Sequence, residues 1–238
     1  MPHAEASPVA AVTGANGGIG TATRIALENR GYIVFGLDLG AHGDESIDTD
    51  VSNAESVEKA FAEVLSAAGR LDAVVAGAGI VEDDIAAETM SSDQFQSVIS
   101  VNLTGVFHTL TAAGRVMLEA GRGRMVAISS MSGNHTVNRP QNQCAYNASK
   151  AGVSALVRSL AAEWSGRGVR INAIAPGYVA TPLLEKKQHQ LAGWLEHIPQ
   201  GRLAQPNEVA EAIAFLLSDE AGYFSGSELL MDGGYSLV

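Results

Sequence analysis

The chain of 238 residues is poor in several features that mark particular classes of protein. It contains one cysteine, Cys144, so no disulfide can form within it, as is typical of a reducing compartment. No apolar run approaches the ~20 residues that a membrane-spanning helix needs. The amino terminus lacks the basic and apolar regions of a signal peptide. We therefore expect a cytoplasmic protein with no membrane partner.

Basic residues are also scarce. Lys and Arg total 15 against 26 Asp and Glu, for a formal net charge of −11, and Lys186-Lys187 is the longest basic run. A surface of this charge would repel the phosphate backbone of DNA or RNA, so we expect no nucleic-acid partner. We assign no metal site from the sequence, and the expected partner is a small-molecule substrate.

Short apolar runs alternate with helix-like segments along the whole chain. This alternation predicts an α/β fold, in which a parallel sheet has helices on both faces. We predict a single doubly wound Rossmann-type domain over residues 1–238, with a seven-stranded parallel sheet. One connection is short, because only eleven residues separate Asp38 from Asp50, and we expect no helix there. Expected strands include 9–12, 32–37, 71–76, 125–128, 169–175 and 228–231; expected helices are 19–29, 54–68 (after a capping box at 52–55), 93–120, 146–164 and 206–217.

A glycine-rich turn follows the first expected strand and opens the first expected helix. Gly14 allows a tight turn, Gly18 lets the backbone approach a phosphate, and Gly20 permits close packing of the helix. The helix amino terminus would then face a pyrophosphate, which predicts a dinucleotide site. Asp38, at the end of the second expected strand, can accept hydrogen bonds from both adenosine ribose hydroxyls and would repel a 2′-phosphate. We therefore expect NAD(H) and not NADP(H).

A second group of residues indicates proton transfer. Tyr146 and Lys150 stand four residues apart, on one face of an expected helix. The ammonium group would favour the phenolate and bring the pKa of Tyr146 below that of a free tyrosine, as a general base requires. Ser130 follows an apolar strand and could hydrogen-bond a substrate oxygen. Asn102 is a polar residue within an apolar helix, which implies a hydrogen-bond partner.

Taken together, these motifs resemble the short-chain dehydrogenase/reductase family over essentially the whole chain. The resemblance implies a homotetramer, packed through the 93–120 and 146–164 helices. It identifies Asn102, Ser130, Tyr146 and Lys150 as the catalytic set, with Asn102 holding a water that connects the lysine to solvent. It implies that the cofactor is held by Gly14, Asn16, Gly17, Gly18, Ile19, Gly20, Asp38, Asp50, Val51, Ala78, Gly79, Tyr146, Lys150, Pro176, Gly177, Val179 and Thr181.

Two departures from the family pattern bear on the site. Ala76-Gly77-Ala78-Gly79 stands where the family often has Asn-Asn-Ala-Gly, which removes an asparagine that braces the sheet. Fifteen residues separate Ser130 from Tyr146, so Ser132 competes with Ser130 for the serine role.

The segment from Val137 to Gln143 is similar to the subgroup of the family that acts on sugar alcohols and ketoses. Its Pro140-Gln141-Asn142-Gln143 run offers amides that could pair with a polyol's hydroxyls, although it could equally be a hydrated loop. Candidate substrate residues are Ser130, Ser132, Gln141, Tyr178 and Trp194, with 183–205 as a lid. The favoured activity is an NAD-dependent alcohol or polyol dehydrogenase; the alternatives are a 3-oxoacyl-thioester reductase and a non-catalytic dinucleotide-binding scaffold.

Overall fold

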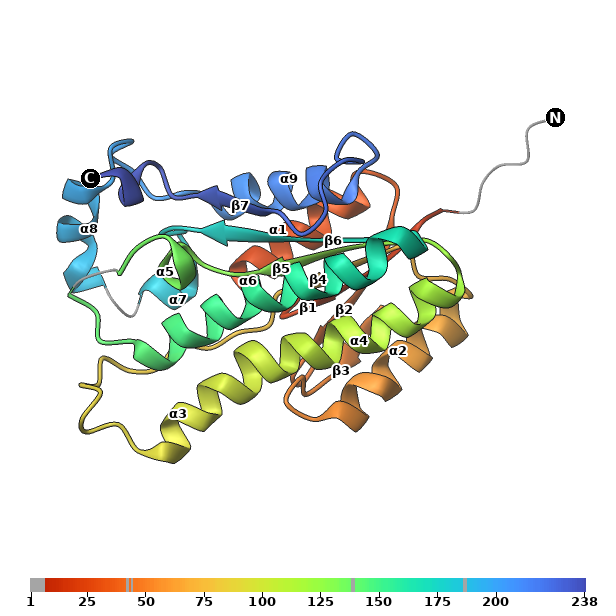
Figure 1. Ribbon diagram of the computed structural model, residues 1–238, viewed down its shortest axis with the longest axis horizontal. Helices are drawn as coiled ribbons and strands as arrows, with labels where there is room; N and C mark the ends of the chain where they lie inside the picture. The colour runs from red at the N-terminus through yellow and green to blue at the C-terminus, as the bar shows by residue number, and fades with distance from the viewer. Residues whose placement is uncertain (1–6, 42, 44, 138–139, 186–187) are drawn as a thin grey trace.

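A computed structural model describes residues 7–41, 43, 45–137, 140–185 and 188–238. Its centre is a seven-stranded parallel sheet in the order β3-β2-β1-β4-β5-β6-β7, which confirms the predicted fold class (Figure 1). The strands are β1 (Val9–Thr13), β2 (Ile33–Asp38), β3 (Ser46–Asp48), β4 (Ala73–Ala76), β5 (Gly123–Ile128), β6 (Val169–Pro176) and β7 (Glu228–Met231). The helices are α1 (Gly18–Glu28), α2 (Ala54–Ala68), α3 (Ser92–Ile99), η1 (Ser100–Thr104), α4 (Gly105–Glu119), α5 (Met131–Asn134), α6 (Cys144–Trp164), η2 (Ser165–Arg167), α7 (Pro182–Glu185), η3 (Gln188–Gln190), α8 (Leu191–His197), α9 (Pro206–Leu217) and η4 (Tyr235–Leu237).

Helices cover both faces of the sheet. On one face, α2, α4 and α6 pack through Phe61, Leu110 and Val157, among others, against one side of the strands. On the other, α1 and α9 pack through Leu27 and Ile213. Every residue of β1 and β4 is buried, as expected for central strands of a parallel sheet whose two faces are covered. The α7 and α8 segments gather beyond the carboxyl ends of β6 and β7 (Figure 1).

The short connection after Asp38 is as predicted. Its described residues form no helix, and β3 pairs with β2 in parallel over three residues, from Gly36 opposite Ser46 to Asp38 opposite Asp48. The turn is held by Gly40 N–H donating to the Asp48 carboxylate at 2.7 Å and by Thr49 N–H donating to the Asp38 carbonyl at 2.9 Å. A short hydrogen-bonded turn therefore replaces the usual crossover helix.

Two predicted elements differ in detail. The residue that caps α2 is Asn53 and not Ser52, because the Asn53 side chain accepts from Glu55 N–H and Ser56 N–H, whereas Ser52 bonds to Asp50. The segment predicted as one helix over 93–120 is helical throughout but changes to a π-helical turn at η1, between α3 and α4. Such turns arise when a local contact displaces one residue of the ladder, and a count of apolar periodicity does not detect them.

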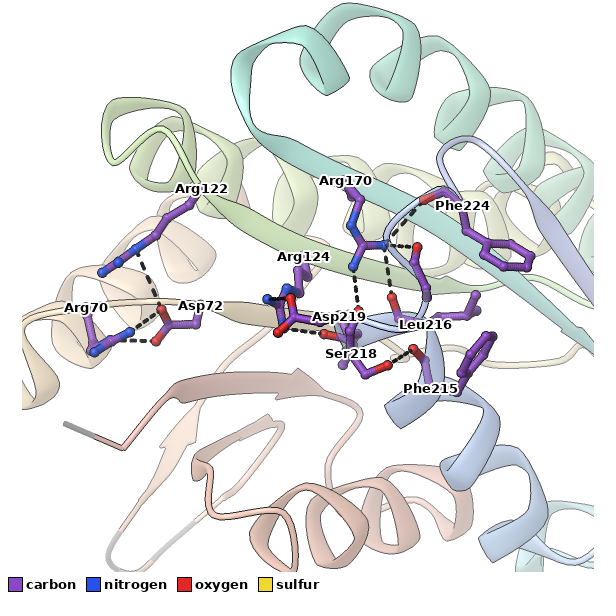
Figure 2. A network of polar contacts seen from close by, with 12 residues as sticks. Arg70, Asp72, Arg122, Arg124, Arg170, Phe215, Leu216, Ser218, Asp219 and Phe224 are labelled. Carbon is purple, nitrogen blue, oxygen red and sulfur yellow. Dashed lines mark hydrogen bonds and ion pairs between the residues drawn. The ribbon is translucent and has the colours of Figure 1, made fainter. Parts of the chain in front are cut away.

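Arginines tie the strands together at the amino-terminal edge of the sheet. Figure 2 shows Arg170, from β6, donating to the carbonyls of Leu216, Ser218 and Phe224, and it also reaches that of Ala221. These carbonyls belong to the carboxyl end of α9 and the turn after it, where helical partners run out. Arg124, on the neighbouring strand, donates to the Leu217 carbonyl and pairs with Asp219. Burial and the charge of Arg124 lower the pKa of Arg170, while the charge of Asp219 acts in the opposite direction.

We expect Arg170→Ala to lower the free energy of unfolding by about 2 kcal/mol, because it leaves several carbonyls without their charged donor. Denaturant unfolding monitored by circular dichroism measures the change. Arg122→Ala is the matched control: its side chain is 65% exposed and lies 3.9 Å from Asp72, so its removal should change stability by less than ~0.5 kcal/mol. Equal losses in the two variants would contradict a special role for Arg170.

Candidate functional site

The glycine turn after β1 is packed too closely for other residues. Gly14 has φ of +70°, and a Cβ on it would lie 2.8 Å from the Ala78 Cα. A Cβ on Gly20 would lie 2.0 Å from the Gly14 carbonyl oxygen. Helix α1 starts at Gly18 with Gly17 as its cap residue, and it has neither a side-chain cap nor an acidic residue in its first turn. Its first amide groups are therefore suited to hold an anion such as a pyrophosphate.

Asp38 lies against this turn. Its Oδ2 atom accepts from Asn16 N–H at 2.8 Å and its Oδ1 atom from Leu39 N–H at 2.8 Å. The carboxylate thus joins the end of β2 to the glycine turn and leaves its remaining lone pairs for a ligand at the same edge. This is the arrangement expected of an acid that binds a ribose beside a pyrophosphate.

The other predicted cofactor residues lie at the carboxyl ends of the strands. Ser52 donates to Asp50 from both N–H and hydroxyl, and Val51 is buried against Gly105, where an added Cβ would lie 2.7 Å from a Val51 methyl. A Cβ on Gly18 would lie 2.8 Å from the Thr181 methyl, so the segment after β6 reaches the glycine turn. Gly177 and Val179 belong to that same segment, Pro176 is the last residue of β6, and Ile19 packs against the core that α1 covers.

The missing asparagine after β4 has a substitute. The Thr13 hydroxyl accepts from Gly77 N–H at 3.1 Å and from Ala78 N–H at 3.4 Å, and it reaches the Val75 carbonyl at 3.5 Å. One hydroxyl therefore braces the end of β1 against the end of β4. The side-chain brace at this edge therefore comes from Thr13, the last residue of β1.

Three predicted catalytic residues meet beyond β5. Ser130 caps α5, while Tyr146 and Lys150 lie in the first two turns of α6. The Lys150 Nζ atom donates to the Ile128 carbonyl at 2.7 Å and lies 5.7 Å from the centroid of the Tyr146 ring. Burial lowers the pKa of Lys150 to about 8, because desolvation penalises its charged form.

The pKa of Tyr146 differs from the prediction. Burial raises the pKa of the phenol above that of a free tyrosine, a hydrogen bond with Ser130 acts in the opposite direction, and the charge of Glu82 raises the pKa further. The sequence argument counted the ammonium group of Lys150 but not desolvation, which acts on every buried phenol. Without a ligand, this protein therefore favours the protonated phenol.

Asn102 has the partners that its position in an apolar helix implies. It is fully buried in η1, where its Oδ1 accepts from Ile80 N–H at 2.8 Å. Its amide donates to the Ile80 carbonyl at 2.8 Å and to the Ser149 hydroxyl at 3.2 Å. Ser149 in turn donates to the Tyr146 carbonyl at 2.7 Å. Asn102 therefore joins the loop after β4 to the helix that carries Tyr146 and Lys150.

The three serines after β5 have different surroundings. The Ser129 hydroxyl contacts the Lys150 carbonyl at 3.1 Å and the Ser154 hydroxyl at 2.7 Å, which is a packing role between β5 and α6. The Ser130 and Ser132 hydroxyls lie 3.0 Å apart. Because the Ser130 side chain also hydrogen-bonds Tyr146, the geometry favours Ser130 over Ser132 as the serine beside the phenol.

The predicted substrate residues beyond this cluster lie together. The Tyr178 hydroxyl donates to Gln141 Oε1 at 3.3 Å, and Trp194 stacks on the Tyr178 ring with centroids 4.3 Å apart. Trp194 is only 2% exposed and packs in one cluster with Met131, Ile198 and Tyr235, so it joins the predicted lid segment to α5 and η4 and does not lie on the surface. Residues 138–139 and 186–187, within the predicted substrate loop and lid, lie outside the described residues.

Sequence reasoning missed Glu82, which lies in the loop after β4 and is 7% exposed. Its Oε1 atom accepts from Ala145 N–H at 3.0 Å and Tyr146 N–H at 3.1 Å, and its Oε2 atom lies 3.2 Å from the same Tyr146 nitrogen. The only signal was the acidic run Glu82-Asp83-Asp84, which is typical of a solvated loop.

A family model described as enoyl-(acyl carrier protein) reductase matches residues 14–236. The galactitol 2-dehydrogenase (L-tagatose-forming) of Cereibacter sphaeroides is 41% identical, over 96% of this chain and 94% of that protein. The D-threitol dehydrogenase of Mycolicibacterium smegmatis is 38% identical, over 96% and 93% respectively. The crystal structure of a short-chain type dehydrogenase/reductase from Mycobacterium marinum has a TM-score of 0.91 at 33% identity, covering 96% of this chain and 95% of that one.

The buried lysine predicts a dependence of stability on pH. Between the folded pKa of about 8 and the ordinary value of 10.5, the unfolded chain holds a proton on Lys150 that the native state has lost. Stability should therefore rise with pH across this window, by up to about 1.4 kcal/mol per pH unit from this group. Lys150→Met should remove that rise. Chemical denaturation of both proteins from pH 7 to pH 10 measures it, and parallel curves would contradict the assignment.

Proposed function

The chain belongs to the short-chain dehydrogenase/reductase family and is an oxidoreductase of secondary alcohols and ketones; we propose that it transfers hydride between NAD(H) and a polyol or sugar-like ketose. The observation that carries the proposal is the cluster of Ser130, Tyr146 and Lys150 at the sheet edge where the glycine turn also lies. The cluster of Ser130, Tyr146 and Lys150 suits proton transfer, and the glycine turn suits the binding of a dinucleotide.

The residues around the glycine turn fit a dinucleotide. The uncapped amino end of α1 would take the pyrophosphate, and Asp38 would take the ribose hydroxyls of the adenosine half. Asp38 also supports NAD(H), because its carboxylate would repel a 2′-phosphate. When bound, the nicotinamide supplies the hydride acceptor or donor that the protein itself lacks.

The proton transfer is assigned to Tyr146. In alcohol oxidation its phenolate oxygen takes the proton of the substrate hydroxyl, and in ketone reduction its hydroxyl returns one. The Ser130 hydroxyl orients the substrate oxygen and stabilises its developing charge. Lys150, whose pKa lies near 8, contributes a positive charge that favours the phenolate when the site is working. Asn102 connects this helix to the loop after β4, and a water held there would extend the proton path.

The substrate class rests on two supports. Two relatives are named for galactitol and D-threitol, both polyols. The candidate substrate residues Ser132, Gln141 and Tyr178 carry hydroxyl and amide groups, which contact Ser130 or one another in the structure and are of the kind that can also pair with the hydroxyls of a polyol. The alternative of a 3-oxoacyl-thioester reductase is less well supported, because Asp38 disfavours the phosphorylated cofactor that such reductases usually take. A panel of polyols and hydroxy acids, monitored by NADH absorbance, tests the class.

The proposal extends to the organisation of the protein. We propose a single catalytic domain over residues 1–238, a homotetramer and a cytoplasmic location. No helix among the described residues is long and apolar enough to cross a membrane. Light scattering at micromolar concentration tests the assembly.

Asp38→Ala should relax the cofactor preference. It removes the carboxylate that repels a 2′-phosphate, so kcat/KM with NADP should rise relative to kcat/KM with NAD by ~10-fold or more. Affinity for NAD should also fall, because Asp38 holds the Asn16 amide. Initial rates at limiting concentrations of each cofactor measure the ratio, and Asp48→Ala, at the paired position on β3, is the control. A wild-type protein that prefers NADPH would refute the assignment.

Tyr146→Phe removes the phenolic hydroxyl group and keeps the ring, and it should lower kcat by at least ~10²-fold, as expected for a positioned acid–base group. The Kd for NAD should change less than kcat, since Phe keeps the ring and removes only one of the expected cofactor contacts. Steady-state kinetics and a fluorescence titration separate the two effects. Tyr223→Phe, which alters a fully exposed ring, should leave both unchanged. Near-normal turnover by Tyr146→Phe would remove Tyr146 from the mechanism.

A further inference from the structure

Glu82 is a buried carboxylate that touches the helix carrying the proposed acid–base residue. It comes from the loop after β4, 64 residues before Tyr146, and is 7% exposed. Its oxygens accept from the N–H groups of Ala145 and Tyr146 at 3.0–3.2 Å, and these lie in the first turn of α6. The helix itself has no side-chain cap from its own cap residue, Gln143. Glu82 therefore acts as the cap of α6 from a distant part of the chain.

The position of this cap affects the electrostatic environment of Tyr146. The free N–H groups at a helix amino end carry a partial positive charge, which stabilises a nearby anion. Tyr146 is the third residue of α6, so this partial charge would favour its phenolate. The Glu82 carboxylate accepts from two of those N–H groups and adds a full negative charge at this turn of α6, next to the Tyr146 backbone. Both effects disfavour the phenolate.

Few charged groups face Tyr146 from the described residues. Lys150 lies 5.7 Å from the ring centroid on its own helix, Glu82 faces it from the loop after β4, and the end of β5 contributes only the Ser130 hydroxyl. Asp84, in the same loop as Glu82, accepts from Asn142 N–H at 2.8 Å and is directed at the segment before α6. The phenol therefore has one nearby cation, Lys150, whose charge favours the phenolate, and one nearby anion, Glu82, whose charge disfavours it.

We propose that Glu82 is a positioning residue that keeps Tyr146 protonated until higher pH and so favours its action as the acid in ketone reduction near neutral pH. The inference rests on the proposed acid–base role of Tyr146. The proposed effect has the same direction as that of the Glu82 charge, which raises the pKa of Tyr146. In alcohol oxidation the same carboxylate delays formation of the base, so activity in that direction rises at a higher pH than Lys150 alone would allow.

The test is Glu82→Gln, which keeps an oxygen to accept the N–H groups of Ala145 and Tyr146 but removes the charge. The apparent pKa of kcat/KM for alcohol oxidation should fall by about one unit, the low end of the effect of a close like charge. The ratio of reduction to oxidation rates at pH 7 should fall with it. Asp84→Asn is the matched control: it removes a carboxylate from the same loop that also caps a backbone N–H, and it should leave the profile unshifted.

Failure of this inference can be distinguished from failure of the proposed function. A Glu82→Gln protein with lower thermal stability or lower kcat but an unshifted pH profile would show a purely structural cap and overturn the inference. An active Tyr146→Phe protein would instead refute the proposed function, so the two failures are distinguishable. If Glu82→Gln does not fold, Glu82→Met, which has a side chain of similar length and no charge, is titrated by NMR with 13C at tyrosine Cζ. The Tyr146 signal, assigned by its loss in Tyr146→Phe, should titrate at lower pH than in the wild type, and an unshifted titration would overturn the proposal.

Discussion

The buried ammonium group of Lys150 constrains the arrangement of the whole catalytic edge. A cation that is 4% exposed must find an acceptor, and it finds the Ile128 carbonyl at the last residue of β5. That bond sets how far α6 lies along the sheet and therefore where Tyr146, one turn earlier, meets Ser130. Burial disfavours the charged form of the lysine and lowers its pKa, although the proposed chemistry needs that charge.

Backbone polar groups at the two edges of the sheet are treated in different ways. At the amino edge, Arg124 and Arg170 use their fixed forks of donors to satisfy the carbonyls where α9 ends, and the result is a closed structural network. At the carboxyl edge, glycines bring the backbone of β1 against that of the loop after β4, and amide groups at the start of α1 have no side-chain cap. The edge that is left incomplete by protein groups is the one suited to a ligand.

The candidate site was predictable where its chemistry is local. Gly14, Gly18 and Gly20 follow an apolar strand, and Tyr146 and Lys150 share a helix face, so short spacings were enough to place them. Asp38 was found because a strand ends there. Glu82 was missed because its partner is 64 residues away, and an acidic loop residue has no pattern that distinguishes it from a solvated one. The buried position of Trp194 could not be predicted from the sequence either, since its stacking on Tyr178 depends on how the segment after β6 folds back.

The order of apolar strands and helices, and the identity of the residues at each strand end, were determined by the sequence alone. Side-chain periodicity and turn chemistry act over a few residues, and the right-handed crossover rule then allows few topologies. Only the tertiary structure decided the π-helical turn that turns Asn102 toward Ile80, the hydroxyl of Thr13 that replaces a missing asparagine, and the protonation preference of Tyr146. Each of these depends on burial or on a partner that is distant in the sequence, and neither is present until the sheet has assembled.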